Sequence, residues 1–138
     1  MKIVLISCVS KKLPYKAKAR DLYVSPLFRL GLKYAESLRP DRIFVLSAEH
    51  GLVDLEKEIE PYNKTLNAMS SDDVRAWAER VLLQLRDSSD LANDEFIFLA
   101  GERYRKHLVP HIANYVIPLK GLGIGRQLKY LKEATPHE

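Results

Sequence analysis

The sequence predicts an α/β fold of three layers, Rossmann-like, with a mainly parallel sheet of about four strands and helices on both faces. Short apolar runs rich in β-branched and aromatic residues recur along the chain, and segments with apolar residues at helical spacing separate them. Strands that alternate with helices favour parallel pairing through right-handed crossovers. The length of 138 residues suits one hydrophobic core, so we expect a single domain over residues 1–138.

The first half of the chain predicts two buried strands and one helix. Residues 2–7 form the first apolar run, and residues 42–47, "RIFVLS", form the second. Between them, Ser25 is placed to cap a helix with Pro26 at its first position, and Pro40 marks its end. The stretch "AEHGLVDLEKEIEPYNKTLNAM" follows the second strand. Its apolar residues show neither the alternation of a strand nor the spacing of a helix, and we expect it to be irregular.

The clearest amphipathic pattern follows this stretch. Ser70 or Ser71 is expected to cap the helix, with acidic residues in the first turn where the helix dipole favours negative charge. Its apolar face is predicted to comprise Val74, Trp77, Ala78, Val81, Leu82 and Leu85.

The last part of the chain predicts two more strands and two helices. Residues 95–100, "EFIFLA", read as the third strand, and a short helix from about Glu102 is interrupted near Pro110. Residues 115–119 read as the fourth strand, which Pro118 places at an edge of the sheet. The final helix is expected to turn three side chains inward, those of Ile124, Leu128 and Leu131.

Composition and charge narrow the class of protein. No apolar run approaches the length of a bilayer span, and the single cysteine cannot form an internal disulfide, so we expect a cytoplasmic protein without membrane association, structural metal or cofactor. Six basic residues and no acid precede Asp21, and the segment from Gly101 to Tyr130 holds six basic residues against Glu102 alone. This asymmetry favours an anionic partner, the alternative being a solvated surface.

The predicted strand ends coincide with this charge. Ligands of doubly wound sheets bind beyond the carboxyl ends of the strands, here the loops "CVSKK", "SAEHGLVD", "GERY" and "KGLGIG". In the first loop, backbone N–H groups, serine hydroxyls and Lys11 and Lys12 suit a phosphate, although the glycines of a Walker A loop are missing. Cys8 is either a nucleophile or a small buried side chain. The glycines of "GLGIG" either offer N–H groups to a phosphate or form a tight turn.

Two further segments hold candidate polar groups. In the irregular stretch, His50, Tyr62 and Asn63 suit acid–base work or recognition of an unstacked base, with surface positions as the alternative. In "AGERYRKH", Glu102 is either a helix-dipole partner or a carboxylate that polarises water.

Six motifs in order, "SCVSKK", "ARDLYVSPLFR", "LSAEHGLVD", "IEPYNKTL", "LAGERYR" and "PLKGLGIGRQLKYL", resemble an uncharacterised domain family of bacteria and phages. That family is similar in fold to the uracil-DNA-glycosylase-like superfamily and is akin to the YaaA peroxide-stress proteins. The resemblance implies nucleic acid or modified bases as the substrate class, with N-glycosidic cleavage as the chemistry. His50 stands where the family often has Tyr, and Asn63 where Asp is usual, so the chain is expected to bind without cutting if that Asp is catalytic in relatives.

We therefore expect a protein directed at a nucleic acid, a modified nucleobase or a nucleotide, acting as an N-glycosidase. The alternatives are a non-catalytic nucleic-acid-binding protein of stress response or phage defence, and an enzyme that processes small nucleotides or nucleosides. The sequence does not determine the oligomeric state. The candidate catalytic residues are Asp21, Glu102 and Asn63. The candidate phosphate- and base-binding residues are Cys8, Ser10, Lys11, Lys12, Ser47, His50, Tyr62, Arg103, Tyr104, Gly121, Gly123, Gly125 and Arg126.

Overall fold

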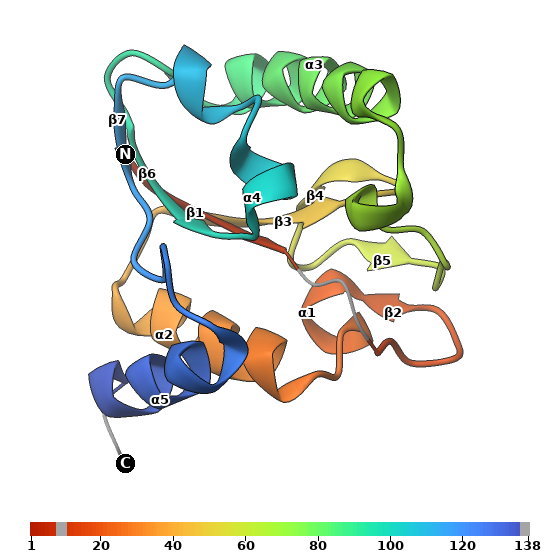
Figure 1. Cartoon of the computed structure of the whole chain (residues 1–138), viewed down its shortest axis with the longest axis vertical. Coiled ribbons are helices and arrows are strands. Elements are labelled where there is room, and N and C mark those ends of the chain that lie inside the picture. The colour runs from red at the N-terminus through yellow and green to blue at the C-terminus, as the bar shows by residue number, and fades with distance from the viewer. Residues whose placement is uncertain (8–10, 136–138) are drawn as a thin grey trace.

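A five-stranded, mostly parallel sheet forms the centre of the structure, a computed structural model that describes residues 1–7 and 11–135 (Figure 1). The strand order is β4-β3-β1-β6-β7, and all neighbours pair in parallel except β3 and β4. The strands are β1 (Lys2–Ser7), β3 (Arg42–Ser47), β4 (Gly51–Asp54), β6 (Glu95–Leu99) and β7 (Asn114–Val116).

Helices cover both faces of this sheet (Figure 1). On one face lie α3 (Ser71–Ser88) and α4 (Glu102–Arg105), and on the other lie α2 (Pro26–Ser37) and α5 (Ile124–Ala134). Alternate side chains of β1 enter the two resulting cores, Leu5 that of α3 and Ile6 that of α2. The predicted mixed α/β fold is thus confirmed.

The main sheet has five strands, one more than the four that the sequence predicts. The additional strand, β4, lies within the stretch expected to be irregular, where the chain turns back from β3 and pairs with it in antiparallel fashion. Gly51 starts this strand with a φ of 73°, a conformation that glycine adopts without strain. Four residues are too few to show a period, so β4 has no clear sequence signal.

A second, two-stranded sheet lies beside the main one. It pairs β2 (Ala17–Lys18) with β5 (Glu58–Ile59), and α1 (Ala19–Leu22) follows β2 directly. The remaining elements are two short 3₁₀ turns, η1 (Leu66–Ala68) and η2 (Val109–His111). In the described part of the chain, no helix combines the length and the apolar composition needed to cross a bilayer.

The predicted helix starts are confirmed by their hydrogen bonds. The Ser25 Oγ accepts from the backbone N–H of Phe28 at 3.2 Å, and the Ser70 Oγ accepts from that of Asp73 at 3.1 Å. The predicted apolar face of α3 is buried throughout. The prediction for α5 is partly wrong, because Leu131 is buried whereas Ile124 is 67% exposed at the first position of the helix.

Trp77 anchors α3 to the sheet. Its indole Nε1–H donates to the buried carbonyl oxygen of Ser47, at the end of β3, at 2.8 Å. Trp77→Phe removes this donor and leaves a gap, so we expect the free energy of unfolding to fall by about 1–3 kcal/mol in urea denaturation followed by circular dichroism. Leu83→Ala, on the exposed side of the same helix, is the control, with an expected change within about 0.5 kcal/mol. Equal losses in the two variants would contradict this role.

Candidate functional site

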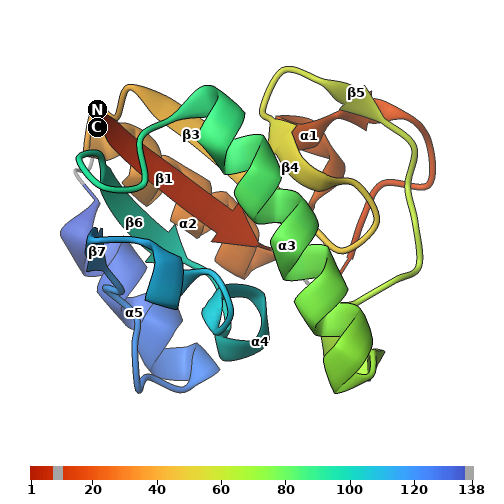
Figure 2. The same cartoon turned by 90° about the horizontal axis from the view of Figure 1, so that it is seen from above.

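The path of the chain creates a switch point at the carboxyl ends of β1 and β6, which pair in parallel. From β1 the chain passes through α2 to β3 on one side, and after β4 it passes through α3, on the opposite face, to β6 on the other side of β1 (Figure 2). At their carboxyl ends, β1 leads toward α2 on one face of the sheet and β6 leads into α4 on the other face. This is the switch point at which open α/β sheets bind ligands, beyond the carboxyl ends of the strands.

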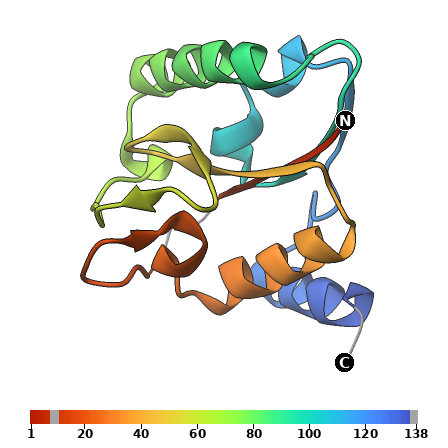
Figure 3. The same cartoon turned by 180° about the vertical axis from the view of Figure 1, so that it is seen from behind.

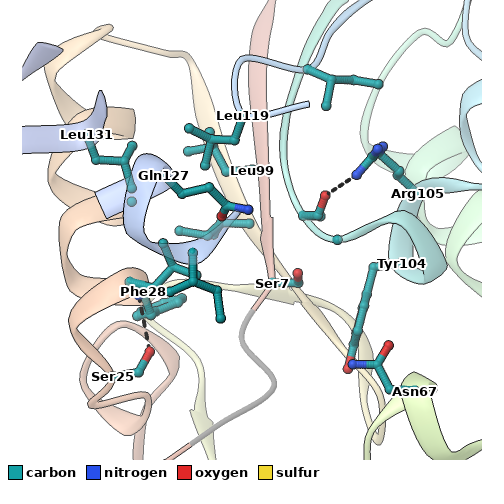
Figure 4. Close-up of a pocket in the computed structure, with 17 residues that line it drawn as sticks. Ser7, Ser25, Phe28, Asn67, Leu99, Tyr104, Arg105, Leu119, Gln127 and Leu131 are labelled. Carbon is teal, nitrogen blue, oxygen red and sulfur yellow. Dashed lines mark hydrogen bonds between the residues drawn. The ribbon is translucent and has the colours of Figure 1, made fainter. Parts of the chain in front are cut away.

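A pocket of about 260 Å³ lies at this switch point. Its floor is formed by the ends of the two central strands, with Ile6 and Ser7 from β1 and Leu99 from β6 (Figure 4). The other lining residues are Ser25, Leu27, Phe28, Gly31, Asn67, Ala100, Gly101, Tyr104, Arg105, Ile117, Leu119, Ile124, Gln127 and Leu131.

One wall of the pocket is mainly apolar. This side is formed by Phe28 of α2, by Leu131 of α5 and by Leu119, which precedes α5 (Figure 4). Gln127 of α5 projects among these side chains. The Gln127 Nε2 donates to the carbonyl oxygen of Leu122 at 2.8 Å, which fixes the orientation of the amide. Its amide oxygen accepts no hydrogen bond from the described residues and is available to a ligand.

The facing wall is polar. Tyr104 is buried, and its hydroxyl accepts from the backbone N–H of Leu66 at 3.3 Å and lies 3.3 Å from the Thr65 Oγ1. Arg105 donates to the carbonyl oxygen of Ala100 at 2.8 Å, while Asn67 presents its amide beside Tyr104 (Figure 4). Hydroxyl, amide and guanidinium groups thus face an apolar wall across a narrow space.

The charge of the pocket is positive. Arg105 is the one charged side chain among the described lining residues, and none of these is a carboxylate. No group of three or more His, Cys, Asp or Glu side chains that could hold a metal ion occurs within residues 1–7 and 11–135. The lining therefore suits a neutral or anionic organic ligand with hydrogen-bonding edges.

A second polar cluster lies outside the pocket lining, around Tyr62. The Lys12 Nζ lies 4.5 Å from the centroid of the Tyr62 ring, and the His50 ring meets that ring edge-on at 5.5 Å. The hydroxyls of Tyr62 and Tyr23 are 2.7 Å apart. The His50 Nε2 is buried and has no hydrogen-bond partner among the described residues. Here three predicted residues, Lys12, His50 and Tyr62, come together.

Other predicted residues have roles in holding the loops. The Ser47 Oγ accepts from the backbone N–H of His50 at 2.9 Å, which closes the turn between β3 and β4. Arg103 donates to the carbonyl oxygens of Leu66 and Met69 at 3.3 and 3.1 Å, which ties η1 to α4.

The remaining predicted residues are distributed as follows. Tyr104 is the one described member of the predicted set that lines the pocket. Cys8 and Ser10 lie outside the described residues. Eight predicted residues are exposed and line no part of the pocket: Lys11, Asp21, Asn63, Glu102, Gly121, Gly123, Gly125 and Arg126.

Sequence reasoning missed most of the pocket lining, although the motifs contained all of it except Ile6, Gly31, Asn67 and Ile117. Phe28 lies in "SPLFR", Arg105 in "GERYR" and Gln127 in "GRQL", each within a motif that surrounds the pocket. The motif pattern was the available signal. It located the turns but not the side chains that face inward.

Residues 3–133 match a protein family described as a family of unknown function (DUF6884). The match covers all six motifs and confirms the expected relation to an uncharacterised domain family. No curated protein and no solved structure matches the chain.

The apolar wall of the pocket depends on the packing of α5 against α2. Tyr34 of α2 and Tyr130 of α5 meet with ring centroids 5.9 Å apart and planes at 68°. Burial, together with a hydrogen bond to Tyr130, raises the pKa of Tyr34 to about 12 from an ordinary value of 10.0.

This raised pKa predicts a loss of stability at high pH. In the folded chain Tyr34 keeps its proton above the pH at which the unfolded chain loses it, so the unfolded state binds fewer protons and stability falls as pH rises from 10.0 to about 12. Urea denaturation at several pH values should show this decline, and Tyr34→Phe should reduce it. Tyr115→Phe, at an exposed tyrosine of β7, should leave the decline unchanged. A decline of the same size in the Tyr34→Phe variant would contradict the assignment.

Proposed function

The chain belongs to a protein family of unknown function, DUF6884, and from the geometry of its pocket we propose that it binds a nucleobase, presented free, in a nucleotide or in a nucleic acid. The observation that carries this proposal is the pocket at the switch point between β1 and β6, with an apolar wall facing amide, hydroxyl and guanidinium groups. A nucleobase has the same division, because its faces are apolar and its edges carry donors and acceptors.

The polar groups support recognition of a base edge. Asparagine and glutamine amides combine a donor and an acceptor, the pairing that base edges require. Asn67 and Gln127 approach the pocket from opposite sides, and the second is already oriented by its bond to Leu122. The volume of about 260 Å³ lies just below the range of about 300–1,000 Å³ typical of small-molecule sites. It therefore suits one base or nucleoside.

The lysine pair supports an anionic extension of this ligand. The backbone N–H of Val24 donates to the carbonyl oxygen of Lys11 at 3.0 Å, and Lys12 forms a β-bridge with Tyr23. Val24 directly precedes Ser25, which lines the pocket. Lys11 and Lys12 are thus held next to the segment that enters the pocket wall, where they can neutralise a phosphate carried by the sugar of the bound base.

A charge placed at the pocket rim tests base binding. Ile124 is 67% exposed and lines the pocket, so Ile124→Glu puts a carboxylate beside the ligand without disturbing the core. Calorimetric titration with a panel of nucleobases, nucleosides and nucleoside monophosphates should show binding by the unaltered protein and affinity at least about tenfold lower in this variant, as expected for a weakening of about 1.4 kcal/mol.

The matched control is Leu83→Glu, which places the same charge at a residue that is 62% exposed on α3. It should bind like the unaltered protein. Equal affinity of the two variants, or absence of binding to every member of the panel by the unaltered protein, would overturn the proposal.

A second candidate function is cleavage of the N-glycosidic bond of the bound nucleotide. Cleavage develops positive charge on the sugar, so it requires a carboxylate near the pocket. Glu102 follows Gly101 and precedes Tyr104, both of which line the pocket, whereas Asp21 lies on α1 and is exposed. This position favours Glu102 over Asp21 as the catalytic carboxylate.

Incubation with DNA and RNA that carry modified bases, with free base measured by mass spectrometry, tests cleavage. We expect Glu102→Gln to lose base release and Asp21→Asn to retain it, because only the first removes a carboxylate beside the pocket. If the unaltered protein releases no base from any substrate, cleavage is excluded for those substrates and base binding alone is the function supported.

A further inference from the structure

Tyr15 is an exposed tyrosine in a basic turn, and it does not line the pocket. Tyr15 is 61% exposed, and its neighbours Pro14 and Lys16 are exposed as well. The turn lies at the periphery of the molecule before β2, on the side opposite β7 and α5 (Figures 2 and 3). A large aromatic side chain that remains in water in the folded chain has its apolar area available for a partner.

The backbone of this turn is held on both sides. Before it, the backbone N–H of Leu13 donates to the carbonyl oxygen of Leu22 at 2.8 Å. After it, β2 pairs with β5, and the backbone N–H of Ala19 donates to the carbonyl oxygen of Lys57 at 2.9 Å. The two ends of the turn are therefore positioned before any partner arrives, which lowers the entropic cost of binding.

The charges around Tyr15 are positive. Residues 11–20 contain five basic side chains and no acid. Two of them, Lys18 and Arg20, are paired with Glu56 at 3.1 and 2.8 Å, and these hydrogen bonds hold the pKa of Glu56 below its usual value. Lys11 and Lys16 form no ion pair within the described part of the chain. In the sequence, Tyr15 thus lies between two lysines that no described carboxylate pairs with.

We propose that this turn binds single-stranded nucleic acid, with a base stacked on the Tyr15 ring and the adjoining phosphates neutralised by Lys11 and Lys16. A polyanion with exposed flat rings matches both the charge and the aromatic surface. A duplex hides the faces of its bases, so an unpaired strand is the form that fits. The inference rests on the proposed function for the class of ligand and extends it. The strand that supplies the base to the pocket extends to the turn, where nucleotides farther along it bind.

Fluorescence anisotropy with short labelled oligothymidylate, oligouridylate and a hairpin duplex tests this inference. Tyr15→Ala should weaken single-strand binding about tenfold, within the range expected for one stacked base, while Tyr15→Phe should bind within about twofold of the unaltered protein because the ring is retained. Tyr115→Ala, at a tyrosine that is 42% exposed on β7, is the matched control and should change nothing. Lys11→Ala with Lys16→Ala should flatten the salt dependence by about 0.7 for each phosphate that is no longer neutralised.

The outcomes separate this inference from the pocket proposal. Free nucleosides should be insensitive to Tyr15→Ala and sensitive to Ile124→Glu. If the protein binds nucleosides but no oligonucleotide, the proposed binding site at the turn is wrong and base binding in the pocket is supported. If oligonucleotides bind in a way that depends on Tyr15 but no nucleoside binds, the site at the turn is supported and base binding in the pocket is wrong. Equal effects of Tyr15→Ala and Tyr115→Ala, loss of binding in Tyr15→Phe, or duplex binding as tight as single-strand binding would each overturn the turn as a stacking site.

Discussion

The burial of β1 on both faces is the constraint on which the rest of the structure depends. Ile3, Val4 and Leu5 are fully buried, and consecutive side chains enter opposite cores. A strand in this position needs a hydrogen-bonded neighbour at each edge and a helical layer on each face. The chain meets both needs by running from β1 to β3 on one face and returning to β6 on the other. The divergence of these two paths leaves the space that becomes the pocket.

Much of this fold could be predicted from the sequence, because the signals for its central elements are local. The β1 and β3 segments are continuous apolar runs, and Ser70 with the spacing around Trp77 defines α3. The strand β4 could not be predicted in this way, since its pairing depends on the neighbouring β3 and on a turn at Gly51. Ile124 shows a related limit, because helical spacing does not tell where a helix extends beyond the layer it covers.

The candidate site was predictable as a place but not as a set of side chains. Four of the six motifs contribute residues to the pocket lining, whereas "LSAEHGLVD" and "IEPYNKTL" contribute none. Short helices such as α4 have too few residues for their sequence to show which side chains face the pocket. In α4, Arg103 binds the carbonyl oxygens of Leu66 and Met69, and Arg105 lines the pocket. Two arginines two positions apart in one turn thus have different roles, which composition and charge do not distinguish.

The small sheet of β2 and β5 shares no strand with the five-stranded sheet, and the turn that carries Tyr15 leads directly into the small sheet. Ile59 of β5 is buried in the same core as Val4 of β1 and Ile97 of β6. The turn residues Pro14, Tyr15 and Lys16 are exposed, so changes at these three positions leave that core intact. The exposed residues of the turn can therefore vary in evolution without change to the pocket lining. For the same reason the turn is a suitable graft point, at which a recognition loop from another protein can be installed without redesign of the hydrophobic core.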